Sequence, residues 1–448
     1  MSFRLQTMDN MDSHFKKTEY LLQSLVSGKT FKDKGWMLDA PGNEQAGLIR
    51  AIYNKKQLTV KDDSWGIYKF ADWLPIDNTL KGSFAPLTYK STALAKELGL
   101  ENLYITFSGY WPEKGIKMPT CSFKETESYN VCARLDTSNK KVLVVASAGN
   151  TARAFARVCS DNNIPLLLSV PEDNLDALWF DKPINENVKL IASRSGGDYF
   201  DSIFLSNLAC QIDGFIPEGG AKNIARRDGM GTTVLSAATF IGRIPDYYFQ
   251  AVGSGTGAIA AWEANLRLIG DGRFGNHKMK LMVSQNLPFK PIYDAWQKNS
   301  RELLPFHDHD ARKQVEEIDA KVLSNRRPPY SLAGGLYDAL VDTNGEVLLA
   351  NNYQAQIAGK LFEDTEGIDI HPAAAIATAT LIDSVKNGTV EKDAVIMLNI
   401  TGGGENRFKK DNELIYLKPS LVFDIEPNLE EVKEKLEILL GDFPLLRG

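Results

Sequence analysis

The sequence predicts an α/β fold with two domains and mainly parallel sheets. After Pro86, short apolar runs alternate with amphipathic stretches, which is the pattern of parallel strands joined by crossover helices. The chain has 448 residues, more than one hydrophobic core usually serves, so two domains are expected. The apolar runs expected to be strands are Leu103–Phe107, Lys141–Ala146, Ile164–Val170, Val188–Ala192, Tyr247–Val252, Lys280–Val283, Val347–Ala350 and Ala394–Ile400.

The composition is that of an ordinary globular protein, with 43% hydrophobic and 24% charged residues. A formal net charge of -6 argues against a nucleic-acid or anionic-membrane surface. The N-terminus has no apolar region of the signal-peptide type, and no apolar run approaches the roughly 18–20 residues that cross a bilayer. The 4 cysteines form no C-x-x-C pair, which fits reduced thiols and argues against a zinc ribbon. We therefore expect a cytoplasmic protein.

A polar turn follows the expected strand Lys141–Ala146 and precedes a helical stripe of apolar residues. Ligands of parallel α/β folds bind outside the carboxyl ends of the strands, so such turns are candidate sites. A turn that opens a helix presents unpaired backbone N–H groups to an anion such as a carboxylate. The alternative is an ordinary connection capped by Asn150 or Thr151. The candidate ligand-binding residues are Ser147, Gly149, Asn150 and Thr151.

A glycine-rich turn follows the expected strand Tyr247–Val252. Its glycines allow a phosphate to approach the backbone, and its hydroxyl groups add donors. A dinucleotide-binding turn is the competing interpretation, but the next strand runs into Ser284 and Gln285 where an acidic residue is required. A cup for a phosphate monoester suits the turn best. Its residues are Gly253, Ser254, Gly255, Thr256 and Gly257.

Two further features complete the candidate site. Thr401 follows an apolar run and precedes three glycines. The glycines would leave space beside a flat ligand; the alternative is that they form an ordinary turn. Lys124 stands at the head of an expected helix, where the helix dipole disfavours a cation. A solvated surface lysine is the common alternative. The functional interpretation is that burial and the local field lower its pKa and make it a Schiff-base nucleophile.

The segments "PTCSFKE", "SAGNT", "GSGTG" and "TGGG" occur in the order seen in the fold-type II enzymes of pyridoxal 5′-phosphate (PLP), which share the tryptophan synthase β-like fold. The segments "FAPLTYKSTALAKELGLENLYI" and "EGIDIHPAAAIA" are similar to the threonine synthase branch of that group. The resemblance extends from about Asp77 to Thr401. It implies that PLP is the cofactor and that family members are commonly homodimers.

The resemblance also implies a domain division. Residues 1–79 form an N-terminal extension packed on the large domain. Residues 80–125 and 232–448 form the large PLP-binding domain. Residues 126–231 form a small mobile domain, with Lys124 at the junction.

By the same resemblance, Lys124 carries PLP as a Schiff base and moves the Cα proton of the substrate. Asn150 bonds the PLP 3′-oxygen, the cup Gly253–Gly257 holds the cofactor phosphate, and Thr401 faces the pyridine nitrogen. Ser147, Gly149 and Thr151 receive the substrate carboxylate.

The segment "NIARRDGMGT", together with departures from the usual threonine synthase pattern at Met118, Cys121 and Glu125, resembles a relative of that branch, and the resemblance implies a particular reaction. It is a β-replacement that converts O-phospho-L-serine and sulfite to L-cysteate and phosphate. The alternative is the threonine synthase reaction, which uses water and O-phosphohomoserine. Arg226 and Arg227 are the candidate ligands of the substrate anions, unless they are a helix-surface pair. We expect no metal ligands, because the run His307–Asp310 is more typical of a solvated loop.

Overall fold

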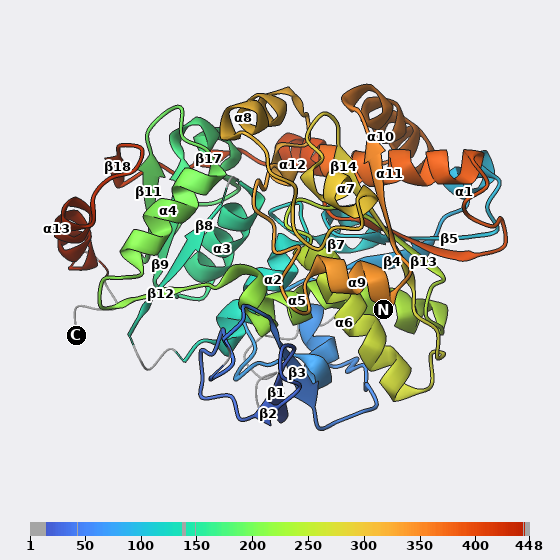
Figure 1. Ribbon diagram of the computed structural model, residues 1–448, viewed down its shortest axis with the longest axis horizontal. Helices are drawn as coiled ribbons and strands as arrows, with labels where there is room; N and C mark the ends of the chain where they lie inside the picture. Colours follow the sequence, from blue (N-terminus) through green and yellow to red (C-terminus); the bar gives the residue numbers. More distant parts are fainter. Residues whose placement is uncertain (1–14, 43, 137–139, 148, 442, 444–448) are drawn as a thin grey trace, which may run out of the picture.

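The computed structural model describes residues 15–42, 44–136, 140–147, 149–441 and 443. Two α/β parts lie side by side, and a small antiparallel sheet from the N-terminal region lies beneath them (Figure 1). Each of the apolar runs expected to be strands overlaps a strand, and the pairing of these strands is mainly parallel. The α/β fold class predicted from the sequence is therefore confirmed.

A six-stranded sheet forms the larger of the two parts. Every neighbouring pair in it is parallel except β4 and β5, which pair antiparallel at one edge. The strands in spatial order are β15 (Glu346–Ala350), β14 (Lys280–Asn286), β13 (Tyr247–Ala251), β16 (Val395–Ile400), β5 (Asn102–Phe107) and β4 (Leu87–Lys90). Since β13, β16 and β5 are parallel neighbours, their carboxyl ends meet at one edge of the sheet.

Both faces of this sheet are covered, which explains why its strands are apolar throughout. In β16, Ile396, Leu398 and Ile400 pack into one core and Met397 into the other, as the two-residue period of a strand requires. The first core is closed by α1 (Ala93–Leu98), α10 (Asn352–Glu366) and α11 (Pro372–Lys386). The second is closed by α5 (Ile224–Ile241), α6 (Thr256–Asp271), α7 (Pro291–Gln297) and α9 (Leu336–Asp342).

A five-stranded, wholly parallel sheet forms the smaller part. Its strands in spatial order are β12 (Phe215–Pro217), β8 (Val142–Ala146), β9 (Leu166–Pro171), β11 (Val188–Ser193) and β18 (Leu421–Phe423). One face packs against α2 (Lys124–Arg134) and α3 (Asn150–Asp161). The other packs against α4 (Tyr199–Ala209) and α13 (Leu429–Leu440).

The C-terminal segment differs in place from the sequence expectation, which assigned residues 232–448 to the large domain. Here β18 pairs with β11 through Ile191–Leu421 and Ser193–Phe423, at the edge of the smaller sheet. The helix α13 follows and lies beside α4, at the far left of Figure 1. The reason is hydrophobic: Val432 and Leu436 of α13 bury completely among Leu205 and its neighbours.

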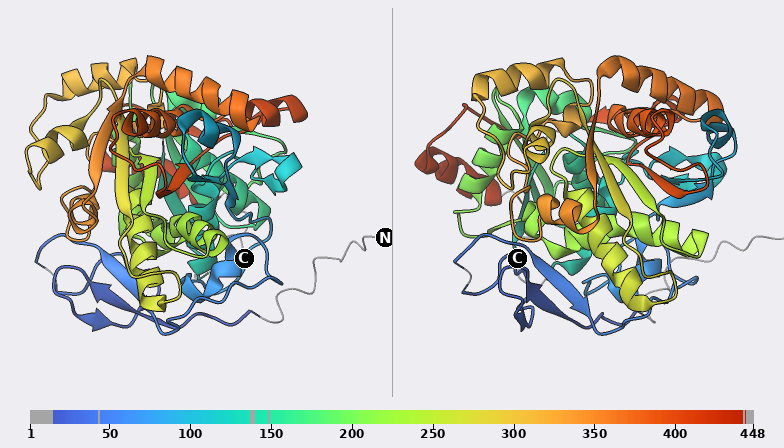
Figure 2. Two further views of the ribbon diagram at one scale, coloured as in Figure 1. Left: turned by 90° about the vertical axis from the view of Figure 1, so that its right-hand side faces the viewer. Right: turned by 45° about the vertical axis from the view of Figure 1, so that its right-hand side comes forward.

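The N-terminal extension contacts both parts. Its strands β1 (Tyr20–Ser24), β2 (Thr30–Phe31) and β3 (Ile49–Tyr53) form an antiparallel sheet, followed by a 3-10 stretch at Gly66–Trp73. Figure 2 shows this sheet lying under α6 and its surroundings. Buried ion pairs fasten it there, since Arg50 pairs with Glu263 of α6 at 3.1 Å. Arg134, at the end of α2, pairs with Asp33 at 2.8 Å.

Shorter elements complete the described chain. The run His307–Asp310 enters a helix at Asp308, whose carboxylate pairs with Arg326 at 2.9 Å. None of the helices in the described residues combines the length and the apolar composition that a bilayer crossing requires. The remaining elements are β6 (Tyr110–Trp111), β7 (Ile116–Lys117), β10 (Trp179–Phe180), β17 (Ile415–Tyr416), α8 (Asp308–Glu317), α12 (Glu405–Asp411) and the 3-10 turns Pro112–Lys114, Glu172–Ala177, Gly220–Lys222 and Lys321–Leu323.

Candidate active site

One cavity gathers residues from four segments that the sequence analysis selected. It lies where β13 and β16 end and where α2, α3 and α6 begin. A larger cavity of about 1060 Å³ lies elsewhere, between the N-terminal extension and the end of α2, and none of the expected site residues lines it. The smaller cavity is lined by Phe123, Lys124, Asn150, Gln250, Ala251, Val252, Gly253, Ser254, Gly255, Thr256, Gly257, Val322, Leu323, His371, Ala373 and Thr401.

The position of Lys124 is fixed by the segment before it, which is bonded to the end of β16. The backbone N–H of Phe123 donates to the carbonyl of Thr401 at 2.9 Å, and Ser122 bridges to Gly402. The Ser122 hydroxyl then accepts the backbone N–H of Lys124 at 3.1 Å, which opens α2. The lysine therefore starts its helix beside Thr401, as the sequence suggested but could not show.

The amine of Lys124 is largely withdrawn from water, with 19% of its side chain exposed. Burial lowers its pKa, and nearby Arg226 lowers it further, while Glu127 at 3.2 Å opposes both. A lysine with a lowered pKa holds more of the free amine that attacks a carbonyl carbon. The electrostatics therefore fit a Schiff-base lysine.

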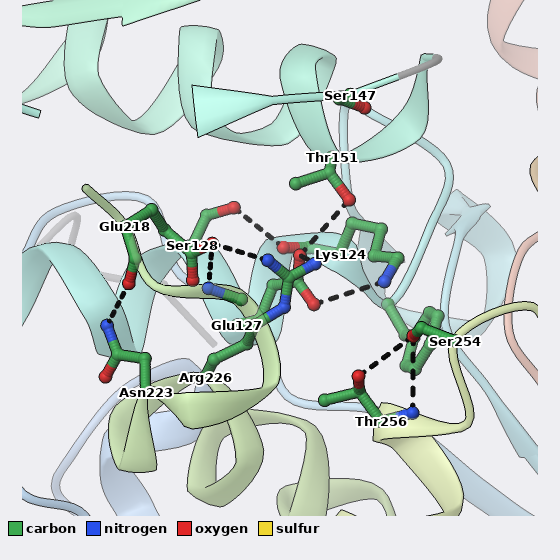
Figure 3. Close-up of polar contacts among 12 residues, drawn as sticks. Lys124, Glu127, Ser128, Ser147, Thr151, Glu218, Asn223, Arg226, Ser254 and Thr256 are labelled. Atoms are coloured by element: carbon green, nitrogen blue, oxygen red, sulfur yellow. Dashed lines mark hydrogen bonds and ion pairs between the residues drawn. The ribbon is translucent and has the colours of Figure 1, made fainter. Parts of the chain in front are cut away.

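The turn Gly253–Gly257 forms a close-fitting cup that opens α6, a helix of 16 residues. A Cβ at Gly253 would lie 2.9 Å from the carbonyl oxygen of Val322, and Gly255 has φ +75. The Ser254 and Thr256 hydroxyls lie 2.9 Å apart (Figure 3). Hydroxyls and free N–H groups at a helix N-terminus suit a phosphate group.

The turn Ser147–Thr151 lies across the cavity from the cup, as Figure 3 shows for Ser147 and Thr151. Asn150 lines the cavity, and its side-chain oxygen accepts from Arg153 at 2.9 Å. That bond leaves the N–H₂ group of Asn150 as the donor for a ligand oxygen. Gly149 donates its N–H to the Ser147 hydroxyl at 3.0 Å, while Thr151 donates to Glu127 at 3.3 Å.

The sequence analysis missed two residues that shape this site. His371, which the sequence analysis did not select, lines the same cavity as Thr401. A Cβ at Gly402 would lie 2.2 Å from its ring, so that glycine lets the histidine approach. Arg153 is fully buried, bonds the carbonyl of Thr120 at 3.0 Å and stacks on Trp179 at 3.8 Å. In the sequence, His371 could have been noticed because it lies in the segment "EGIDIHPAAAIA", which resembles the threonine synthase branch.

The two candidate anion-binding arginines point to different places. Arg226 lies beside Lys124, between the carboxylates of Glu127 at 3.0 Å and Glu218 at 2.6 Å (Figure 3). Arg227 does not join the site. It is fully buried and pairs with Glu263 at 2.9 Å, and its guanidinium also bonds backbone carbonyls. Adjacent residues of a helix point about 100° apart, which separates the pair.

Residues 89–402 match the protein family described as pyridoxal-phosphate dependent enzyme, and the chain belongs to it. The expected cofactor is thereby confirmed. The cavity fits that cofactor, since it combines a lysine of lowered pKa with a glycine cup at a helix N-terminus. Curated relatives narrow the class, because the chain also belongs to the cysteate synthase family.

Three of those relatives carry this result. Cysteate synthase of Methanosarcina acetivorans is 47% identical over 416 residues, which are 92% of this chain and 99% of that protein. The enzyme of Methanosarcina mazei is 50% identical over 86% of this chain and 93% of its own. That of Methanocorpusculum labreanum is 46% identical over 88% and 95%.

Solved structures agree in fold. A pyridoxal 5′-phosphate-dependent aspartate racemase superposes with a TM-score of 0.53 at 16% identity, covering 71% of this chain and 90% of its own. Threonine deaminase isoform 2 of Solanum lycopersicum gives 0.53 at 17% identity, covering 73% and 86%. The fold-type II assignment is therefore confirmed.

Proposed function

We propose that this chain is a cysteate synthase that converts O-phospho-L-serine and hydrogen sulfite to L-cysteate and hydrogen phosphate. The observation that supports this proposal most directly is that 92% of this chain is 47% identical to cysteate synthase of Methanosarcina acetivorans. The reaction breaks the Cβ–O bond and forms a Cβ–S bond. The proton that hydrogen sulfite loses balances the one that the leaving phosphate gains.

Bound PLP supplies the electron sink that makes bonds at Cα and Cβ of an amino acid labile. In our proposal the amine of Lys124 holds the cofactor and takes the Cα proton, consistent with its lowered pKa. The cup Gly253–Gly257 holds the cofactor phosphate, and the N–H₂ group of Asn150 donates to its 3′-oxygen. Thr401 lines the cavity and would face the pyridine nitrogen of bound PLP, to which a hydroxyl cannot donate a proton as a carboxylic acid would. That environment favours elimination over transamination.

The substrate carboxylate is assigned to the turn at the head of α3, through Ser147, Gly149 and Thr151. Free N–H groups at the start of a 12-residue helix support this assignment. The substrate phosphate is assigned to Arg226, whose guanidinium can bind it through two parallel hydrogen bonds. Both assignments place anions around Lys124.

We further propose that the part around the smaller sheet, formed mainly within residues 126–231 and completed by β18 and α13, moves to close the site over the substrate. Closure would exclude water, which competes with sulfite for Cβ. The separate cores of the two sheets support the idea. Structures with and without phosphoserine test it, and an unchanged separation of Ser147 and Thr401 would contradict it.

The chain is also proposed to be a cytoplasmic homodimer. Two large apolar side chains one turn apart on α10, Tyr353 and Ile357, are 70% and 51% exposed and support self-association. Light scattering on the purified protein gives the oligomeric mass, and a monomer at micromolar concentration would contradict the proposal.

One assay tests the reaction itself. Phosphate release is followed from O-phosphoserine and from O-phosphohomoserine, each with and without sulfite, and cysteate is identified by mass. We expect fast release from O-phosphoserine and cysteate only when sulfite is present. Threonine formation from O-phosphohomoserine at a higher kcat/KM would overturn the proposal in favour of threonine synthase.

A further inference from the structure

A buried carboxylate joins the lysine of the site to its arginine. Glu127 lies one turn after Lys124 on α2, so both side chains occupy the same helix face. Its side chain is 0% exposed. One oxygen contacts the amine of Lys124 at 3.2 Å, and the other contacts Arg226 at 3.0 Å (Figure 3). The second oxygen also accepts the hydroxyl of Thr151 at 3.3 Å.

Arg226 is fully compensated in this arrangement. Its guanidinium lies between Glu127 and Glu218, whose side chains are 0% and 6% exposed. Burial alone would lower the pKa of Arg226, but the two carboxylates raise it, so this guanidinium keeps its charge. One positive charge thus faces two negative charges. A phosphate dianion can bind this arginine only when one carboxylate has moved away from it.

Of the two carboxylates, Glu127 is the one that can leave at lower cost. Released from Arg226, it keeps Lys124 and Thr151 as hydrogen-bond donors. Glu218 contacts Arg226 more closely, at 2.6 Å, and otherwise accepts only the backbone N–H of Gly220 at 3.0 Å within the described residues. Its second oxygen has no partner there. A buried carboxylate that loses its ion pair is strongly unfavourable.

We propose that Glu127 is a positioning residue that links the proton held at the Lys124 nitrogen to the occupancy of Arg226 by a substrate anion. The proposal rests on the function proposed above and extends it. When an anion takes Arg226, the carboxylate of Glu127 turns wholly to Lys124. Substrate binding at one residue thereby changes the proton affinity of the nitrogen at the other.

The direction of the coupling follows from the charges that face the lysine. These belong to Glu127 on α2, Arg226 on α5 and Glu218 after β12. The hydroxyl of Tyr199 on α4 faces Arg226 and the two carboxylates. Glu127 raises the pKa of Lys124 and Arg226 lowers it. An anion on Arg226 offsets the second effect and strengthens the first, so the pKa of the lysine nitrogen rises. By thermodynamic reciprocity, anions bind more tightly when that nitrogen is protonated.

The wild-type holoenzyme allows a direct test without any substrate. The visible absorption of the lysine-bound cofactor is titrated with pH, first without added anion and then with saturating inorganic phosphate. We expect phosphate to move the titration midpoint to higher pH and to bind more weakly above that midpoint. If phosphate leaves the midpoint unchanged, the coupling does not exist and the proposal is overturned.

The Glu127→Gln variant then identifies the coupling residue. It should lower the midpoint by about one pH unit, because it removes an opposite charge beside the nitrogen. The shift caused by phosphate should also shrink. Glu125→Gln is the control for a buried glutamate-to-glutamine change on the same helix, at 1% exposure. Its carboxyl group bonds Thr120, and among the described residues it forms no hydrogen bond or ion pair with the Lys124 or Arg226 side chain. A phosphate response in Glu127→Gln equal to that of wild type would refute the role.

Kinetics separate positioning from folding. Glu127→Gln should lower kcat at least tenfold while KM for O-phosphoserine falls or stays constant, because Arg226 loses a competitor. A merely structural defect would lower the fraction of active enzyme and leave KM and the midpoint unchanged. Glu127→Asp keeps the negative charge and should therefore have a titration midpoint near that of the wild type. This variant provides the test if Glu127→Gln folds poorly. Since the titrations use no substrate, their outcome is independent of which phosphorylated amino acid the enzyme accepts.

Discussion

Phe123 donates its backbone N–H to the backbone carbonyl of Thr401 at 2.9 Å. Gly403 likewise donates to the carbonyl of Cys121 at 3.1 Å. These bonds fasten the start of α2 to the end of β16 in the larger sheet, whereas Tyr129, Val131 and Cys132 farther along α2 pack into a core of the smaller part. Lys124 is the first residue of that helix. The backbone at Lys124 is thus fixed to the larger sheet, whereas the helix that Lys124 begins also contacts the smaller part.

Replacement of Lys124 with alanine should remove the attachment of the cofactor. We expect the wild-type protein to be yellow and to retain the cofactor covalently after borohydride reduction, with Lys124 as the labelled residue in peptide mapping. Lys117, exposed on β7, provides the control, and Lys117→Ala should be labelled normally. A label on any other lysine would invalidate the assignment of the cavity.

Replacement of Gly255 with alanine should weaken cofactor binding. The residue has φ +75, and a Cβ there would lie 2.7 Å from the side chain of Leu336. The left-handed conformation alone costs a residue with a Cβ about 1–2 kcal/mol. We expect at least a tenfold faster loss of cofactor during dialysis. Gly270→Ala, in α6 with nothing within 4 Å of its Cβ, should keep the cofactor. Equal retention by both variants would contradict the prediction.

Arg226 and Arg227 should respond differently to alanine substitution. Arg226→Ala removes a charge-assisted contact to the substrate phosphate and should cost about 2–4 kcal/mol in kcat/KM for O-phosphoserine, with the cofactor spectrum retained. Arg227→Ala leaves the buried Glu263 with one ion pair fewer and should lower the free energy of unfolding by roughly 3–5 kcal/mol. Steady-state kinetics and thermal denaturation on both variants separate the effects. Near-normal kinetics in Arg226→Ala would move the anion site elsewhere.

Glu125 should make the protein less stable as pH rises. Burial raises its pKa to about 8 from an ordinary value of 4.5, despite hydrogen bonds from Thr120. Between those values the folded chain holds a proton that the unfolded chain has released. The contribution of Glu125 to the free energy of unfolding is therefore fully present below pH 4.5 and is lost as pH rises through about 8.

Glu125→Gln removes that titration. The thermal midpoint of the variant, relative to that of the wild type, should be higher at pH 9 than at pH 5. The change corresponds to at least about 1 kcal/mol in the free energy of unfolding. Denaturation scans at both pH values provide the measurement. Parallel pH profiles for the two proteins would show that Glu125 is already ionised in the folded state.

Much of the fold was readable from the sequence because parallel strands buried on both faces are continuous apolar runs. The strand Leu421–Phe423 was not, since it has 3 residues and its partner β11 is distant in sequence. The turns of the cofactor cavity were recognisable for a related reason. Their glycines and hydroxyls directly follow parallel strands, so local order alone placed each of them at the carboxyl end of a strand, in the larger sheet for β13 and β16 and in the smaller sheet for β8.

The residues that the sequence did not reveal depend on contacts between distant segments. Nothing near Glu127 distinguishes it from an exposed helical glutamate, because its partner Arg226 comes from α5. A local signal for the different placement of Arg226 and Arg227 did exist, since consecutive residues of a helix point about 100° apart. Their assignment as a pair ignored that geometry.

The pairing of β18 with β11 also affects how the protein is made. The edge of the smaller sheet is completed by Leu421–Phe423, and β5 of the larger sheet finds its neighbour β16 only at Val395–Ile400. During synthesis, both sheets therefore keep an unpaired strand until the segments Val395–Ile400 and Leu421–Phe423 have been made. Such open edges pair readily with other chains. Nascent or C-terminally truncated forms should accordingly depend on chaperones far more than the finished enzyme does.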